Sequence, residues 1–139
     1  MRSKVLDNRK SVEIFMTCKI IALAGVSDDK EKWGYKLFKL IPEHGFKVYG
    51  VNPKLEKVEG EKIYSSLEEL PEKPCGVVFV LNPYAGMKIA ESMVKLGIDK
   101  AWLQPGAEND KLIVYLESNN ITTVHNYCIK VHLSRGQAA

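Results

Sequence analysis

The segment at residues 19–35, KIIALAGVSDDKEKWGY, constrains the fold more than any other stretch of the chain. Its apolar run at residues 20–24 combines β-branched and small side chains, which is typical of a central parallel strand covered on both faces. The run ends at Gly25-Val26-Ser27, where a glycine permits close approach of the backbone and a serine hydroxyl stands beside backbone N–H groups. The segment therefore predicts a strand, an anion-binding turn and then a helix.

The remaining hydrophobic pattern continues this alternation of strands and helices. Helices are expected at residues 4–17, 33–44, 67–70, 84–96 and 110–118, and strands at residues 46–51, 62–64, 76–81, 100–103 and 121–124. Such alternation implies right-handed crossovers and a mostly parallel sheet. We predict an α/β fold, a Rossmann-like three-layer sandwich with a sheet of about five or six strands in the order 3-2-1-4-5-6.

Length and composition favour one globular domain. The 139 residues suit a single Rossmann-like domain at 19–133, with an N-terminal helix at 1–18 packed on it and a flexible tail at 134–139. The net charge of +3, with acids and bases interleaved, is no footprint of nucleic-acid binding. No apolar run approaches the roughly 20 residues that span a bilayer, and charged residues interrupt the N-terminus where a secretory signal would be apolar. A cytoplasmic protein is expected.

Three cysteines lie far apart in the sequence, and no CxxC pair or zinc-finger spacing accompanies them. Free thiols in a reducing compartment are therefore expected for Cys18, Cys75 and Cys128, and no metal site is predicted. Cys128 alone is expected at the carboxyl edge of the sheet. An inert thiol and a mixed disulfide with a ligand thiol both stay open for it. The three histidines are scattered, and none has a partner placed for catalysis.

In the predicted topology four turns meet at the carboxyl edge of the sheet, where parallel α/β sheets bind ligands. These turns are Gly25–Ser27, Asn52–Lys54, Asn82–Tyr84 and Gln104–Gly106. The first has only one glycine of the G-x-G-x-x-G fingerprint of dinucleotide-binding proteins. The second has a neutral residue and a cation where an NAD site carries an acid, which favours a phosphate on or near the ribose. A solvated Lys54 without a ligand role is the alternative.

Several short motifs occur in order across residues 19–133. They are Ala24-Gly25-Val26-Ser27, Lys32-Trp33-Gly34-Tyr35, Val48-Tyr49-Gly50-Val51-Asn52-Pro53, the segment GEKIYSSLEELP at 60–71, and Trp102-Leu103-Gln104-Pro105-Gly106. Together they resemble the small stand-alone CoA-binding domain proteins, which are related to the CoA-binding domain of the succinyl-CoA synthetase alpha subunit. The chain departs from that pattern at residues 82–84, where relatives carry an Arg-rich turn, and at residues 127–129, where Arg-Cys-Pro is common.

The resemblance implies coenzyme A as cofactor, with the pyrophosphate on the first turn and the adenosine 3′-phosphate beside the second. The binding residues that it implies are Gly25, Val26, Ser27, Lys32, Trp33, Gly34, Tyr35, Asn52, Pro53, Lys54, Leu81, Asn82, Pro83, Tyr84, Gln104, Pro105 and Gly106.

We therefore expect a protein that binds CoA or an acyl-CoA and has no complete catalytic constellation of its own. Acyl-CoA synthetase chemistry needs a phosphorylatable histidine and an ATP-grasping domain, so catalysis would require a partner protein, and homo-oligomers stay open. The alternative from another class is an NADP-binding oxidoreductase or redox sensor, which the same Lys54 would suit.

Overall fold

The computed structural model describes the backbone of residues 8–138 and the side chains of residues 8–135. Its elements, in chain order, are α1 (Asn8–Phe15), β1 (Ile20–Ala24), α2 (Trp33–Leu40), the 3-10 helix η1 (Ile41–His44), β2 (Lys47–Val51), β3 (Lys57–Val58), β4 (Glu61–Tyr64), the 3-10 helix η2 (Leu67–Glu69), β5 (Gly76–Phe79), α3 (Pro83–Leu96), β6 (Lys100–Leu103), α4 (Asp110–Ser118), β7 (Thr122–Val124) and α5 (Ile129–Ala138).

The strands form one sheet in the order β3-β4-β2-β1-β5-β6-β7. All neighbouring pairs are parallel except β3 with β4, and the register of the central pair places Ile20 opposite Lys47. The α/β class and the predicted order of the parallel strands are confirmed. The five or six strands expected become seven because β3 adds an antiparallel edge strand.

The edge hairpin of β3 and β4 lacks an ordinary sequence signal. Val58 pairs with Glu61, so Glu59 and Gly60 form a two-residue loop. Both have positive φ angles, 54° and 81°. Such a loop normally carries Asn-Gly or Asp-Gly, because few side chains tolerate a positive φ. The glutamate at the first position explains why the hairpin was not predicted.

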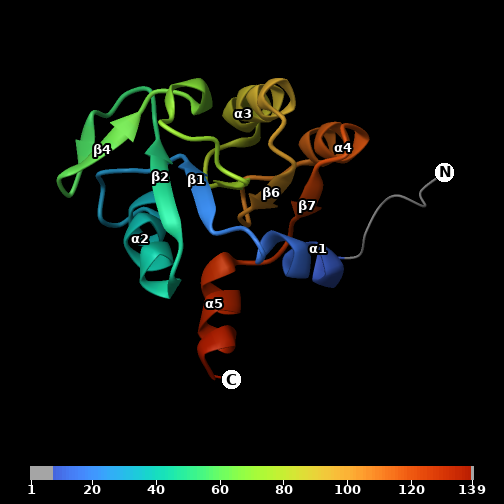
Figure 1. The fold of residues 1–139 in the computed structure, drawn as a ribbon, viewed down its shortest axis with the longest axis horizontal. Helices are drawn as coiled ribbons and strands as arrows, with labels where there is room; N and C mark the ends of the chain where they lie inside the picture. Colours follow the sequence, from blue (N-terminus) through green and yellow to red (C-terminus); the bar gives the residue numbers. More distant parts are fainter. Residues whose placement is uncertain (1–7, 139) are drawn as a thin grey trace.

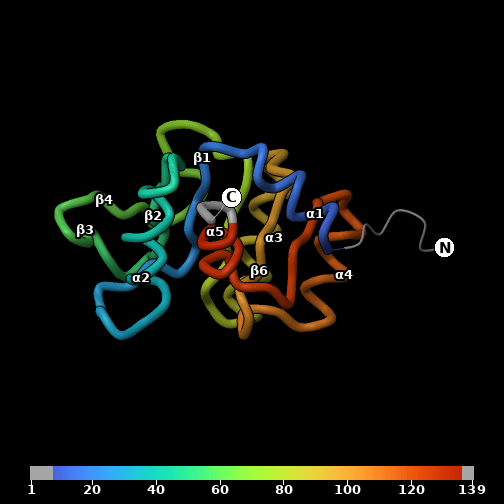
Figure 2. Tube along the Cα trace, turned by 90° about the horizontal axis from the view of Figure 1, so that it is seen from below, coloured from blue at the N-terminus to red at the C-terminus, as the bar shows by residue number. Residues whose placement is uncertain are grey.

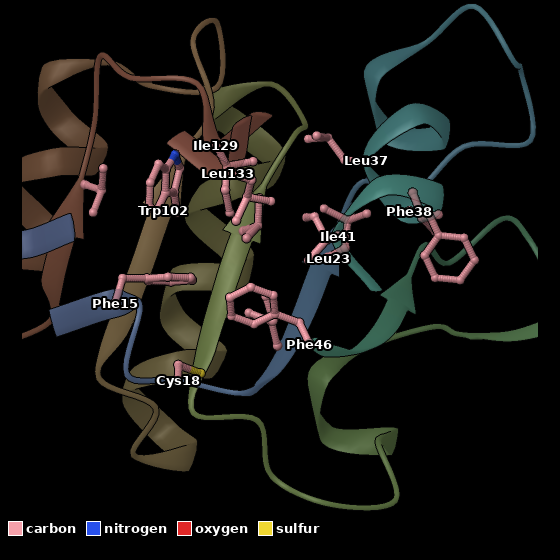
Figure 3. Close-up of a cluster of buried hydrophobic side chains, with 14 of the residues drawn as sticks. Phe15, Cys18, Leu23, Leu37, Phe38, Ile41, Phe46, Trp102, Ile129 and Leu133 are labelled. Atoms are coloured by element: carbon pink, nitrogen blue, oxygen red, sulfur yellow. The ribbon is translucent and has the colours of Figure 1, made fainter. Parts of the chain in front are cut away.

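Helices cover both faces of the sheet (Figure 1), which makes the three predicted layers. One buried cluster joins α1, α2 and α5 to the face that carries Leu23 and Trp102 (Figure 3). The other joins α3 and α4 to the face that carries Ala22 and Phe79. Because successive strand residues point to opposite faces, the unbroken apolar strands supply both clusters. Figure 2 shows α5 between α2 and α1 along the sheet.

The helix α1 packs on the sheet through Phe15. This side chain is fully buried, and its ring meets Trp102 edge to face at a centroid distance of 5.4 Å. A Cβ atom at Gly76 would lie 2.9 Å from the Phe15 ring, so glycine leaves room for it. The helix was predicted at residues 4–17; its first four positions fall outside the described residues, and α1 itself ends at Phe15.

The helix predicted at residues 33–44 changes from α-helical to 3-10 geometry at Ile41, where η1 begins. Pro42 has no N–H for an α-helical hydrogen bond, and Gly45 caps the turn with a φ of 89°.

At the other end of the chain, residues that were predicted to form a tail belong to a helix instead. The sequence pattern did not indicate this helix, α5, which continues through Ala138. No helix in the described part of the chain has the length and apolar character needed to cross a membrane.

The expectation of three free thiols is wrong for two of them. Cys18 follows α1 and Cys75 precedes β5, and the two form a disulfide with a Cα–Cα distance of 5.7 Å. The parallel pairing of β1 with β5 brings the two residues together at the amino ends of these strands. Their separation of 57 residues hid this proximity in the sequence. Cys128 is the only free cysteine among the described residues.

Candidate functional site

A cavity of about 630 Å³ lies at the carboxyl ends of β1, β2, β4 and β5. Its lining combines three of the four turns expected at this edge with one face of α3. The lining residues are Gly25, Val26, Ser27, Lys32, Val51, Asn52, Pro53, Lys54, Ser65, Ser66, Leu67, Val80, Leu81, Asn82, Ala85, Lys88, Ile89 and Ser92. We call this space the main cavity.

The turn after β1 is shaped by Gly25, whose φ is 106°. Its N–H donates to the carbonyl of Val51 at 3.0 Å, which ties the turn to the end of β2. A Cβ atom at Gly25 would lie 3.0 Å from the carbonyl group of Val80. Glycine is therefore required here both by backbone conformation and by the close approach of β5.

Gly34 brings the beginning of α2 against this turn. A Cβ atom at position 34 would overlap the carbonyl oxygen of Gly25 and lie 3.1 Å from the N–H nitrogen of Ser27. This is the role that a later glycine has in dinucleotide-binding turns, where it allows close packing of helix and strand. Gly34 was predicted as a binding residue, but it does not line the main cavity.

Asn52 joins the second turn to the first. Its side-chain amide donates to the carbonyl of Val26 at 2.8 Å, and its Oδ1 accepts from the N–H of Lys54 at 2.8 Å. The side chain is thus occupied by backbone partners on both sides. Asn52 lines the cavity, yet its chief contribution is to hold the two turns in register.

The third turn begins α3, and Asn82 is its N-cap, with Oδ1 accepting from the N–H of Ala85 at 2.9 Å. From there the cavity is lined by Ala85, Lys88, Ile89 and Ser92. These positions follow the i, i+3, i+4, i+7 spacing of one helix face. The sequence prediction missed them, although this spacing after an N-cap at the ligand edge was the signal that could have found them.

Lysines dominate the electrostatics of the main cavity. Lys32, Lys54 and Lys88 line it, and none of them forms an ion pair or a cation–π contact with another described residue. No aspartate or glutamate of the described residues lines it. Ser65 and Ser66, which follow β4, add hydroxyl groups that the prediction also missed. A cavity of this character attracts an anionic ligand.

A second cavity of about 520 Å³ adjoins the first, since Val80, Leu81 and Asn82 line both. Its other lining residues are Trp33, Gln104, Pro105, Gly106, Ala107 and Cys128. This space, the side cavity, is bounded by the fourth predicted turn. The predicted residues Gln104, Pro105 and Gly106 therefore lie beside the third turn but outside the main cavity.

Gln104 is only 4% exposed and is fixed by the chain that follows β7. Its Oε1 accepts from the N–H of Ile129 at 2.7 Å, and its Nε2 lies 3.4 Å from the Cys128 sulfur. These contacts keep Cys128 at the wall of the side cavity. Trp33, which is 45% exposed, lines the same cavity, and the ammonium groups of Lys36 and Lys130 lie 5.3 and 5.6 Å from the centroid of its ring.

Besides Gly34, three further predicted residues line neither cavity. The hydroxyl of Tyr35 donates to Glu59 at 2.6 Å, and this hydrogen bond raises the pKa of Tyr35. Pro83 is the first residue of α3, and the side chain of Tyr84 is 86% exposed. Among the described residues no group of three or more His, Cys, Asp or Glu side chains could hold a metal ion.

A family profile for the CoA binding domain matches residues 19–134. The chain belongs to this CoA-binding domain family. The match covers every strand of the sheet and both cavities. The resemblance inferred from the short motifs is thereby confirmed at the level of the family.

Relatives of this CoA-binding domain occur both alone and within larger enzymes. The uncharacterized protein YneT of Bacillus subtilis is 28% identical over 120 residues, which cover 86% of this chain and 88% of YneT. The alpha subunit of acetate–CoA ligase [ADP-forming] II of Pyrococcus furiosus is 43% identical over 82 residues, which cover 58% of this chain but only 18% of that subunit.

A solved structure of a hypothetical protein from Pyrococcus horikoshii OT3 superposes on this chain with a TM-score of 0.86. The two are 31% identical, and the match covers 95% of this chain and 93% of the other. The same compact α/β domain therefore exists as a protein of similar length.

Proposed function

We propose that this protein binds coenzyme A or an acyl-CoA in the main cavity and the side cavity. The observation that carries the proposal is the set of three lysines around a glycine turn which, within the described part of the chain, have no ion-pair partner and share their cavity with no carboxylate. CoA carries a pyrophosphate and a 3′-phosphate, so it presents several negative charges to such a set. Membership in the CoA-binding domain family agrees with this ligand.

The pyrophosphate is proposed to lie on the turn at Gly25 to Ser27, with Lys32 beside it. Backbone N–H groups at the beginning of a helix suit a phosphate, and the two glycines bring this backbone close to the cavity. Lys54 is proposed to face the 3′-phosphate. Lys88 of α3 stands on the same cavity and supplies a further cation that the sequence did not indicate.

The pantetheine arm is proposed to pass Leu81 and Asn82 into the side cavity, because these residues line both spaces. The side cavity has Trp33, Pro105 and Ala107 on its walls, and no acidic residue lines it in the part of the chain that the structure describes. It therefore suits the uncharged arm and a neutral acyl group. Cys128 stands on this cavity, so a ligand thiol or thioester would lie near it.

We propose an accessory or regulatory role without catalysis by this chain alone. The ligase subunit that it resembles is much longer, and this chain matches 18% of it. A reaction that joins CoA to an acid would need groups from a partner protein, which is part of the proposal, as is a homo-oligomer. A cytoplasmic location is also proposed, although a disulfide is unusual in the cytosol outside hyperthermophiles.

Calorimetry with CoA, dephospho-CoA and NADP tests the proposal. The parent protein is compared with Lys54→Ala and with Lys111→Ala, a matched control whose exposed lysine lies on α4, away from both cavities. Lys54→Ala should weaken CoA binding by about tenfold or more, the loss of one charge-assisted contact, and should change dephospho-CoA binding little. The control should bind all ligands as the parent does.

Two results would contradict the proposal in different ways. Saturable binding of NADP without binding of CoA would replace it with the oxidoreductase alternative. Equal weakening of CoA and dephospho-CoA in Lys54→Ala would keep CoA as ligand but remove Lys54 from the 3′-phosphate.

A further inference from the structure

A third cavity, of about 570 Å³, lies between α1 and α5 and shares no residue with the main or the side cavity. We call it the α1–α5 cleft. Its lining residues are Asn8, Arg9, Val12, Tyr127, His132 and Arg135. Its volume lies within the range of about 300 to 1,000 Å³ that is usual for small-molecule sites.

The floor of the cleft is built on the buried core. Tyr127 stacks on the fully buried Trp102 with a centroid distance of 5.8 Å and an interplanar angle of 26°. The indole N–H of Trp102 donates to the carbonyl of Tyr127 at 2.9 Å. The Tyr127 hydroxyl lies 3.4 Å from Nδ1 of His132. The floor is thus held in place by packing and by hydrogen bonds within the protein.

Two arginines from different helices line the cleft, Arg9 on α1 and Arg135 on α5. Both are exposed, and neither forms an ion pair or a hydrogen bond with another residue in the described part of the chain. Among the described residues, no carboxylate lines the cleft. Two like charges therefore face one space, which is unfavourable unless an anion or solvent ions screen them.

The other polar groups of the cleft agree with this character. Burial, and then the charge of Arg135, lower the pKa of His132, which favours the neutral ring and leaves the two arginines as the charged groups. The amide of Asn8 is occupied, because it donates to the carbonyl of His125 at 2.7 Å and accepts from its N–H at 3.1 Å. The groups left to meet a ligand are the guanidinium groups, the tyrosine hydroxyl and the imidazole.

We propose that the α1–α5 cleft binds a small phosphate-bearing molecule, independently of the CoA site. The planar fork of a guanidinium group matches two phosphate oxygens at once, and two such groups border this one cleft. The Tyr127 ring offers an apolar surface for the organic part of the ligand. If the two arginines were ordinary surface residues without a ligand, nothing would require them to border a preformed cleft with an aromatic floor.

The chain carries its own reporter for this cleft, because it has only two tryptophans and Trp102 lies directly beneath Tyr127. In a Trp33→Phe background the fluorescence of Trp102 is read alone. This protein is titrated with inorganic phosphate and pyrophosphate, and with succinate and sodium chloride at matched ionic strength. The expected result is a saturable change with the phosphates that sodium chloride does not reproduce.

The same titration is made with Arg9→Gln/Arg135→Gln, with Lys111→Gln as the control and with Lys54→Ala to remove a cation of the main cavity. The double variant should lose affinity by about tenfold or more, while the other two should respond as the parent does. Because both arginines are exposed, the double variant should keep the thermal stability and the CoA affinity of the parent, which checks its fold.

Each contrary result overturns the proposal. A response that fails to saturate, or that survives in the double variant, would mean that the cleft binds no phosphate. A response abolished by Lys54→Ala would place the phosphate in the main cavity. Succinate binding as tightly as pyrophosphate would replace the phosphate class by that of dicarboxylates. CoA binding is measured separately, so failure here leaves the proposed function untouched.

Discussion

The carbonyl oxygen of Gly25 occupies the position that a Cβ atom of residue 34 would need. The turn after β1 and the beginning of α2 are therefore in direct backbone contact. Two glycines nine residues apart do here what a cluster of three glycines does in a dinucleotide-binding turn. This relationship explains why the single glycine of the turn does not preclude a phosphate site.

Gly34→Ala should destabilise the protein and weaken CoA binding. The added methyl group would push α2 away from the turn, a form of overpacking that costs about 1 to 3 kcal/mol, which exceeds the gain in helix propensity of about 1 kcal/mol. Urea unfolding and calorimetry measure the two effects.

Gly86→Ala is the matched control, because Gly86 is also helical and the three atoms nearest to its Cβ would be side-chain atoms of Leu112 and Phe79, at 3.2 Å or more. Its stability should stay within about 1 kcal/mol of the parent. If Gly34→Ala were as stable as Gly86→Ala and bound CoA normally, the close contact of turn and helix would be needed neither for stability nor for CoA binding.

Asn52→Ala should weaken CoA binding although the side chain is turned toward the protein. It removes the hydrogen bonds to Val26 and Lys54, and with them about 1 to 3 kcal/mol of stability, since each contributes about 1 kcal/mol. Asn52→Asp keeps the acceptor for the Lys54 N–H but places a negative charge at the anion site. It should therefore bind CoA more weakly than Asn52→Ala, as measured by calorimetry. The reverse order would mean that the anion lies elsewhere.

The disulfide between Cys18 and Cys75 should contribute to stability by closing a loop of 57 residues. The chain-entropy relation gives about 4 kcal/mol for such a loop. Because the bond uses two of the three cysteines, denatured protein that has not been reduced should show one reactive thiol, and reduced protein should show three. Reduction should lower the thermal midpoint of the parent but not that of Cys18→Ser/Cys75→Ser, whereas Cys128→Ser should respond as the parent does. Three reactive thiols before reduction would show that the bond does not form.

The order of the parallel strands was predictable because each buried strand is a short apolar run between turn residues, and right-handed crossovers leave few arrangements. Features that depend on contacts between distant segments were not predictable. The disulfide joins residues that only the pairing of β1 with β5 brings together, and the edge hairpin turns through Glu59, an atypical residue for its conformation.

The candidate site was predictable where it consists of turns at strand ends. The backbone roles of Gly34 and Asn52 were not visible in the sequence, because a binding residue and a residue that positions a turn give the same local motif. Lys88 was missed for another reason: it lies in the second turn of α3, and only the spacing of the helix face that begins at Ala85, which the prediction did not use, points to it.

Protonation of His132 should reduce the stability of the protein at mildly acidic pH. Its pKa is lowered from 6.5, first by burial and then by the charge of Arg135, so between the folded and unfolded pKa values the unfolded chain binds more protons. Stability therefore rises with pH through this window and is lost as the pH falls below 6.5.

His132→Gln should remove this part of the pH dependence, which urea unfolding between about pH 5 and pH 7 measures as a smaller slope. Arg135→Gln should give an intermediate slope, because it removes the smaller of the two causes and leaves the burial of the ring. NMR titration of the imidazole protons should show the pKa of His132 below 6.5 in the parent and closer to 6.5 in Arg135→Gln. A slope unchanged in His132→Gln would assign the pH dependence to other groups.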